Sequence, residues 1–458
     1  MVIAIALTSC ITKKYQAPAG ETAKLFRDTT TTDTITLADV PWQKLFGDTI
    51  LRGLIREGLR ENLDLKVAIQ RLAEAQTGLN QSKSAFFPTL SASAFANPSR
   101  ISKATLNPSL VPFEQLNTTI YQAQFSTSWE ADVWGKLSSA KRSALAGLLE
   151  ADASKRAVQT QLIAQIANAY YYLLALDKQL QITEQTVTSR TEEAKTMKEL
   201  KEANIVNGAA VVQSEANRYA AEVSVPDIKQ AIREAENALS TLLGRPPGSI
   251  RRSTMEEQVI TPDIQTGVPA QLLHNRPDIQ AAEFAFRASF ENTNIARAYF
   301  YPSFTLTADG GLAALKLSDF FNGSVFYNLL GGLTQPIFSG GVNKARFKTA
   351  QARQLEALYN YQKALLTAGQ EVSDDLYSFQ AAREKETTRA KQLVALSKSV
   401  EFTTELLRYS STTNYTDVLT SEQNLLAAQL SSVNDRLQQL QSVVNLYQAL
   451  GGGWKGQP

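Results

Sequence analysis

The sequence predicts a mainly α-helical chain with a small β part, written as two copies of one unit. Three observations predict it. The residues around Pro88 return 214 positions later around Pro302, apolar residues recur every seven positions from Ile166 to Val187, and apolar and polar residues alternate around Phe125. A duplication of roughly 200 residues indicates two copies of one supersecondary unit. Heptads predict long helices that supercoil against their neighbours, and strict alternation predicts β-strands.

The composition limits the classes of function. The 458 residues carry 46 Lys and Arg against 44 Asp and Glu, a net charge of +2, so no nucleic-acid partner is expected. The chain has one cysteine and therefore no disulfide framework. No uninterrupted apolar run approaches the ~18 residues of a membrane-spanning helix.

Residues 1–10 have the pattern of a short lipoprotein signal. An apolar run from Val2 to Leu7 is followed by Thr8, Ser9 and Cys10, which would become the lipidated N-terminus. The alternative is an incidental cysteine. The segment is short and lacks the usual basic residues, and a start site further upstream would explain both. Residues 11–48 are then expected to form an extended lead-in.

The first repeat spans 49–248. Pro88 ends its first helix, expected at 49–85, and a hairpin is expected at 88–131, where Tyr121, Phe125 and Trp129 share one face of the second strand. The other expected elements are a long helix at 133–203, a turn at 204–208, and a return helix at 209–243 that is broken or kinked at Pro226.

The second repeat spans 269–450 and follows a linker at 249–268. Its helix at 269–299 is expected to be interrupted at Pro277, and residues 451–458 form a C-terminal tail. The remaining expected elements are a hairpin at 302–336, a long helix at 340–410, a turn at 411–415 and a return helix at 416–450.

The predicted lengths require a rod. A helix over 133–203 is on the order of 105 Å long, and the two shorter helices of the half match it when stacked end to end. Two hairpins supply four strands, which cannot close a barrel, so a membrane barrel needs several chains. Two chains give eight strands with a filled interior, whereas three give twelve, which can leave an aqueous lumen. The polar residues that fit such a lumen are Gln122, Gln124, Glu130, Thr307 and Asp309.

Several motifs, in this order along the duplicated chain, resemble the TolC-like outer-membrane factors of tripartite efflux pumps, and more narrowly their lipoprotein branch. The resemblance covers nearly the whole chain after Cys10. It implies a homotrimer with a twelve-stranded outer-membrane β-barrel continued by a periplasmic α-helical barrel. The motifs are Trp129-Glu130-Ala131-Asp132-Val133-Trp134-Gly135-Lys136, Ala238-Leu239-Ser240-Thr241-Leu242-Leu243-Gly244-Arg245-Pro246-Pro247-Gly248, Asn275-Arg276-Pro277-Asp278-Ile279-Gln280-Ala281-Ala282-Glu283, Phe300-Tyr301-Pro302-Ser303-Phe304 and Gln335-Pro336-Ile337-Phe338-Ser339-Gly340-Gly341-Val342.

The resemblance also implies partners and a gate. The partners are a periplasmic adaptor protein, a proton-driven inner-membrane transporter of the RND type, and outer-membrane lipid. The family closes its periplasmic end with rings of acidic residues, and Asp417 occupies that place, while the position of a second ring holds Thr420. The alternative explanation, which is compatible with the gate, is that Asp417 is a first-turn carboxylate favoured by the helix dipole. The expected adaptor contacts are Asn204, Asn207, Gly208, Ser411, Asn414 and Tyr415.

No enzyme, metal site or cofactor is expected. His274 is the only histidine and has no Cys or acidic partner at ligand spacing, and no catalytic set occurs at usable spacing. The leading hypothesis is a passive exit duct for drugs or other small molecules. The alternatives are a duct for type I protein secretion or heavy-metal export, and a periplasmic coiled-coil scaffold, which would need no aromatic lipid-facing wall.

Overall fold

The computed structural model describes residues 12–18, 37–102, 104, 117–259, 276–409 and 415–455. The chain clusters into two compact units. Unit 1 contains the described parts of 1–18, 72–151 and 282–361, and unit 2 contains those of 19–71, 152–281 and 362–458. Both repeats contribute to each unit.

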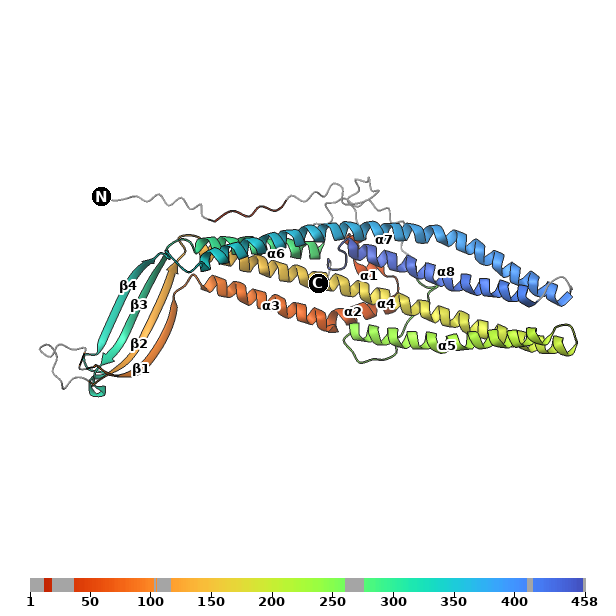
Figure 1. The fold of residues 1–458 in the computed structure, drawn as a ribbon, viewed down its shortest axis with the longest axis horizontal. Coiled ribbons are helices and arrows are strands. Elements are labelled where there is room, and N and C mark those ends of the chain that lie inside the picture. The colour runs from red at the N-terminus through yellow and green to blue at the C-terminus, as the bar shows by residue number, and fades with distance from the viewer. Residues whose placement is uncertain are drawn as a thin grey trace. The chain divides into compact units, whose positions relative to one another are not determined.

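Unit 1 holds a four-stranded antiparallel sheet in the order β1-β2-β3-β4 (Figure 1). β1 (Thr89–Arg100) and β2 (Asn117–Ala131) lie within the first expected hairpin, and β3 (Ser303–Ala314) and β4 (Val325–Thr334) lie within the second. A short 3₁₀ turn, η5 (Leu317–Asp319), follows β3. β2 pairs with β3, so the hairpins of the two repeats join into one sheet whose edges are β1 and β4.

The expected helix at 49–85 is two helices, α2 (Thr49–Glu61) and α3 (Leu63–Ser84), so the prediction of one helix was wrong. Asn62 separates them with ψ 130°, and its side chain accepts from Leu65 N and donates to Leu242 O. The side chain therefore caps the new helix and holds the break against the return helix, because Asn readily takes the N-cap role.

The long and return helices of the first repeat are α4 (Lys136–Glu202) and α5 (Gly208–Leu242). At 1.5 Å per residue, α4 is on the order of 100 Å long. α5 continues through Pro226, so the expected break at that residue does not occur.

The helices of the second repeat are α6 (Pro277–Ala298), α7 (Val342–Tyr409) and α8 (Tyr415–Ala449). Arg276 is not helical and Pro277 is the first helical residue, so within the described residues the proline starts a helix and does not interrupt one. The rest of the expected helix, 269–275, lies outside the described residues, as does His274.

Part of the expected lead-in is folded into the core of unit 2. It forms η1 (Leu37–Asp39) and α1 (Trp42–Leu45), and the indole of Trp42 is 1% exposed. The expectation of an extended segment over these residues was therefore wrong. Burying this large aromatic ring stabilises the segment by more than the conformational entropy lost in ordering a four-residue helix. The core around it includes Phe46, Leu51, Ile55, Ile163, Ile166, Tyr170, Leu173, Leu239, Leu243, Val444 and Tyr447.

In unit 1 the segment 12–18 lies along α6. The Asn294 side chain accepts from Lys13 N (3.1 Å) and donates to Lys13 O (2.9 Å), as a neighbouring strand would. The Tyr15 ring packs against Phe286 and Phe290, with ring centroids 5.8 and 5.7 Å away. This strap fixes the chain next to the helix that leads into β3. Among the described residues, no helix is sufficiently long and apolar to span a membrane.

Candidate functional site

The two faces of the sheet differ in chemistry. Side chains alternate between faces along a strand, and directly paired residues share a face. Ser126 pairs with Asp309 and Ser128 pairs with Thr307, so the polar residues of β2 and β3 lie on one face. All five residues expected to line a lumen, Gln122, Gln124, Glu130, Thr307 and Asp309, therefore share that face.

The opposite face is apolar and uncovered. Phe125 lies there between Ala92 of β1 and Gly310 of β3, and its side chain is 62% exposed. On β4 the exposed fractions are 88% for Tyr327 and 74% for Leu329. A contiguous apolar face of this kind marks a surface that water does not normally cover.

Asp132 and Trp134 fix the start of α4 beneath the sheet. The Asp132 carboxylate accepts from Leu137 N and Ser138 N, both at 2.8 Å, and so caps the helix. The Trp134 Nε1 atom donates to Pro302 O at 2.6 Å, which ties the start of the long helix to the start of β3. Gly135, at φ 72°, lies between Trp134 and the first residue of α4, in a conformation that favours glycine.

The turn between α4 and α5, which we call the first tip turn, is compact. Ile205 N donates to Leu200 O at 2.8 Å, Asn204 has φ 57°, and the Asn207 side chain caps α5 by accepting from Ala210 N. Asn204, Asn207 and Gly208 are exposed, so they are available for contact in this chain. Of the second turn, Ser411 and Asn414 lie outside the described residues.

Tyr415 does not fit the expected role of an exposed adaptor contact. Its side chain is 6% exposed and clusters with Met197 of α4 and Val211 of α5. A residue beside a turn is usually exposed, but burying the aromatic ring of Tyr415 is more favourable than leaving it in water. Tyr415 therefore supports the tip from inside.

The two residues expected at the gate are exposed and lie on α8. Asp417 is in the first turn of α8, where a carboxylate interacts favourably with the helix dipole. Thr420 follows three residues later, on the same side of the helix, and its hydroxyl donates to Thr416 O at 2.8 Å.

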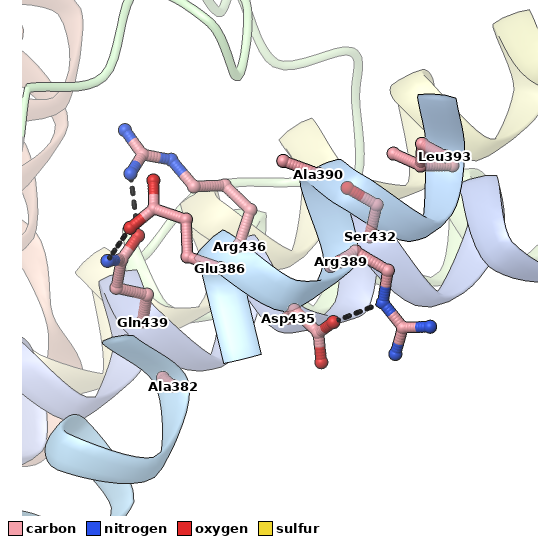
Figure 2. Close-up of a pocket in the computed structure, with 9 residues that line it drawn as sticks. All are labelled: Ala382, Glu386, Arg389, Ala390, Leu393, Ser432, Asp435, Arg436 and Gln439. Atoms are coloured by element: carbon pink, nitrogen blue, oxygen red, sulfur yellow. Dashed lines mark hydrogen bonds and ion pairs between the residues drawn. The ribbon is translucent and has the colours of Figure 1, made fainter. Parts of the chain in front are cut away.

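A charged groove between α7 and α8 was not anticipated from the sequence (Figure 2). It has a cavity of ≈ 250 Å³. Arg389 Nε donates to Asp435 at 2.8 Å, Arg436 donates to the Gln439 side chain at 2.6 Å, and Gln439 in turn donates to Glu386 at 3.2 Å. These bonds hold the return helix to the long helix of the second repeat.

A second unanticipated cluster lies near the tip, between α4, α5 and α8. Its members are Arg190, Glu193, Asn217, Tyr415 and Glu422. The sequence gives one signal for it, since Glu422 matches Glu215 of the first repeat. Which charged residues surround Glu422 depends on which helices pack together, and sequence spacing does not reveal that.

Two arginines, the partly buried Arg252 and the buried Arg276, make ion pairs within unit 2. Arg252 bonds Asp177 at 2.5 Å and Glu236 at 2.6 Å, joining the linker after α5 to α4 and α5. Arg276, with its side chain 8% exposed, pairs with Asp278 and Glu371, both at 2.7 Å, and donates to a backbone carbonyl of α8. Among the residues the structure describes, no group of three or more His, Cys, Asp or Glu could hold a metal ion.

Comparisons with known proteins agree with this geometry. A family model described as "Outer membrane efflux protein" matches residues 54–245 and 268–452. A toluene efflux pump outer membrane protein, TtgF of Pseudomonas putida, is 31% identical over 99% of this chain and 96% of its own length. A pyoverdine export outer membrane protein, OpmQ of Pseudomonas aeruginosa, is 29% identical over 90% of this chain and 87% of its own.

Solved structures have the same fold. The outer-membrane channel OprN superposes with a TM-score of 0.87 at 24% identity, covering 98% of this chain and all of that one. The open state of the Neisseria gonorrhoeae MtrE outer membrane channel gives a TM-score of 0.84 at 25% identity, covering 97% and 98%. The resemblance to outer-membrane factors of efflux pumps, inferred from the motifs, is confirmed. The chain belongs to the outer membrane efflux protein family.

Proposed function

We propose that three copies of this chain form the outer-membrane exit duct of a tripartite efflux pump. The observation that carries the proposal is the four-stranded sheet, with one exposed apolar face, one polar face and two open edges. Open edges cannot lie in lipid, so β1 of one copy pairs with β4 of the next. Twelve strands leave room for a water-filled lumen, whereas eight do not, and the polar face suits such a lumen.

The cargo is proposed to be small organic molecules. The relatives named above export toluene and pyoverdine, and another, 29% identical, is named an antibiotic efflux pump outer membrane protein. Type I protein secretion and heavy-metal export remain alternatives with the same fold. A coiled-coil scaffold is disfavoured because it gives no reason for an uncovered apolar sheet face.

The partners are a periplasmic adaptor and an RND-type inner-membrane transporter. Passage through the duct is passive and involves no catalytic step, so energy enters at the transporter. Asn204, Asn207 and Gly208 at the first tip turn are the proposed contacts for the adaptor, because they are exposed there. Cys10, which lies outside the described residues, is the proposed lipidation site, and mass spectrometry of the intact protein against Cys10→Ser tests that assignment.

The gate is proposed at Asp417. Three copies around a threefold axis would form a carboxylate ring that attracts cations, and the neutral Thr420 would not add a second ring. We expect small, cation-selective single-channel currents for the wild type in planar bilayers. Asp417→Ala should give larger currents or lose selectivity, whereas Asp227→Ala, which removes an exposed carboxylate from α5, should change neither.

The outcomes separate the parts of the proposal. Currents unchanged by Asp417→Ala would keep the duct and remove the gate assignment. A folded protein that conducts under no condition, or that runs as a monomer in native mass spectrometry, would contradict the duct and favour the scaffold.

A further inference from the structure

A cavity lies where the polar face of the sheet meets the ends of two helices. It has a volume of ≈ 200 Å³, and we call it the junction cavity. Glu130 near the end of β2 and Thr305 near the start of β3 pair directly, and both line it from the polar face. Lys136 at the start of α4 and Tyr299 just after α6 also line it, and the whole lining belongs to unit 1.

Aromatic rings form one side of the junction cavity. The Trp134 and Tyr301 rings pack together with their centroids 5.4 Å apart, and the bond from Trp134 Nε1 to Pro302 O fixes the indole. The Tyr299 ring is covered by the Arg346 guanidinium, 3.9 Å from its centre. The open ring surface therefore belongs to Tyr301, which is 37% exposed, and to the partly exposed Trp134. Such a pair offers a flat surface on which another aromatic ring can stack.

The charged groups in the lining are already paired. Lys136 Nζ bonds Glu130 at 2.7 Å and lies 5.1 Å from the centre of the Tyr299 ring. The Asp132 carboxylate, which also lines the cavity, accepts from two backbone N–H groups at the start of α4. A charged ligand would have to compete with these charge-assisted bonds, whereas a neutral ligand would leave them in place. The junction cavity therefore favours a neutral ligand.

Size and one free hydroxyl group narrow the class of ligand. A cavity of about 150 Å³ holds benzene. The ≈ 200 Å³ of the junction cavity therefore suits a single ring with a small substituent. Within the part of the chain that the structure describes, the Thr305 hydroxyl makes no hydrogen bond, whereas the Ser303 hydroxyl in the same lining donates to Thr334 O at 3.4 Å. A free hydroxyl can donate or accept, so it suits a ligand that carries a hydroxyl group of its own.

We propose that the junction cavity is a binding site for neutral, single-ring aromatic molecules that carry a hydroxyl group, such as phenols. The ring stacks on Trp134 and Tyr301, and the hydroxyl group of the ligand bonds to Thr305. The role of the site rests on the proposed duct, in which the polar face lines the lumen and the cavity opens beside the path of the cargo. Phenolic cargo is then held briefly where the helices join the sheet.

Tryptophan fluorescence measures the binding, with 4-bromophenol as the probe because its bromine quenches a nearby indole. In the purified protein in detergent at pH 7, part of the quenching should saturate as the probe concentration rises, and Trp134→Phe should remove that part. Trp129 lies on the opposite face of β2, in the detergent, so its quenching should rise linearly. Trp129→Phe should keep the saturable part, which provides the test if Trp134→Phe does not fold. Absence of saturable quenching in the wild type would overturn the proposal.

Substitutions in the lining test the two contacts. Tyr301→Leu should weaken the binding of 4-bromophenol by about 2–10-fold, because it removes one of the stacked rings. Phe304→Leu removes a ring of similar exposure, 41%, from the opposite face of β3 and should leave the affinity unchanged. Thr305→Val should weaken 4-bromophenol by about 2–10-fold and leave bromobenzene, which has no hydroxyl group, as it was. Equal effects of the two leucine variants, or of Thr305→Val on the two probes, would contradict the site.

Competition tests the need for an aromatic ring. Unlabelled phenol should displace 4-bromophenol from the wild type and so restore the saturable part of the fluorescence. Cyclohexanol has a similar size and the same hydroxyl group but no aromatic ring, so it should not displace the probe at the same concentration. Equal displacement by the two alcohols would mean that the cavity selects by size alone, against the proposal.

Failure of the binding site and failure of the duct give different results, because binding is measured in detergent and conduction in planar bilayers. Channels without saturable quenching contradict the binding site and leave the duct standing. Saturable quenching in a protein that conducts under no condition contradicts the duct and the cargo role, and leaves the binding site. Both results together support the site as part of the duct.

Discussion

Substituting arginine at two adjacent positions of β2 tests the assignment of the sheet faces. Phe125 lies near the middle of the strand on the apolar face, and Gln124 precedes it on the polar face. In the proposed barrel, Phe125→Arg places a guanidinium in lipid, whereas Gln124→Arg places the same group in the lumen. The two variants have identical charge and nearly identical position, so only the facing differs.

The magnitude follows from exposure and depth. Phe125 is 62% exposed in the single chain, and in the barrel this exposed part would contact lipid. A fully buried aromatic side chain contributes about 1.5–3 kcal/mol, so removing Phe125 should cost about 1–2 kcal/mol. An arginine near the bilayer midplane adds about 2–4 kcal/mol. Phe125→Arg should therefore destabilise the folded protein by about 3–6 kcal/mol per chain. Gln124→Arg should stay within about 1 kcal/mol of the wild type, because the lumen is wet.

Urea unfolding in lipid vesicles, followed by the heat-modifiable gel shift, measures both variants. Phe125→Leu serves as the control for a smaller apolar side chain on the same face. Gln124→Arg should also lower the cation selectivity of the channel, which reports on the lumen independently of stability. Equal destabilisation by the two arginines, or a larger effect at Gln124, would refute the assignment of faces.

Three further changes test the helices of unit 2. Gly58→Ala in α2 should destabilise the protein by about 0.5–2 kcal/mol in chemical unfolding, because the new methyl group overlaps the buried Ile166 side chain and overpacking outweighs helix propensity. Gly53→Ala in the same helix meets nothing within 4 Å and should instead stabilise by up to about 1 kcal/mol. Burial raises the pKa of Asp48, but hydrogen bonds from Ser253, Tyr170, Gln258 and Ile50 N outweigh it and hold the pKa below its usual range. Asp48→Asn should therefore cost about 1–3 kcal/mol at pH 7, and its deficit should shrink as the pH falls below about 4, since the wild type loses that stabilisation on protonation. A deficit independent of pH would contradict this reasoning.

The strands and long helices were predictable because each has a strong periodic pattern. Alternation around Phe125 predicts directly which residues of β2 share a face. Once the two hairpins are adjacent, Ser126 of the polar face pairs with Asp309 of β3. The heptads of α4 are unambiguous over many turns, so its ends were placed within about three residues. Periodicity averages over many residues, which makes it robust to a single substitution.

Single residues that act through tertiary contacts were not predictable. The break at Asn62 depends on a carbonyl of α5, far away in sequence, and the burial of Trp42 depends on a core built by several other segments. Pro226 looked like a helix breaker, yet α5 passes through it. Tyr415 was expected to contact the adaptor because it lies beside a turn, but it is buried with Met197 and Val211.

The unpaired edges of the sheet have a genetic consequence. In a closed ring of three chains, every seam joins β1 of one copy to β4 of its neighbour, so one copy with a damaged edge opens the whole ring. When damaged and intact copies are made in equal amounts and mix at random, only about one ring in eight is free of damage. An edge mutation such as a proline in the middle of β4 should thus be dominant over a wild-type gene in the same cell. A mutation that prevents the chain from being made should be recessive.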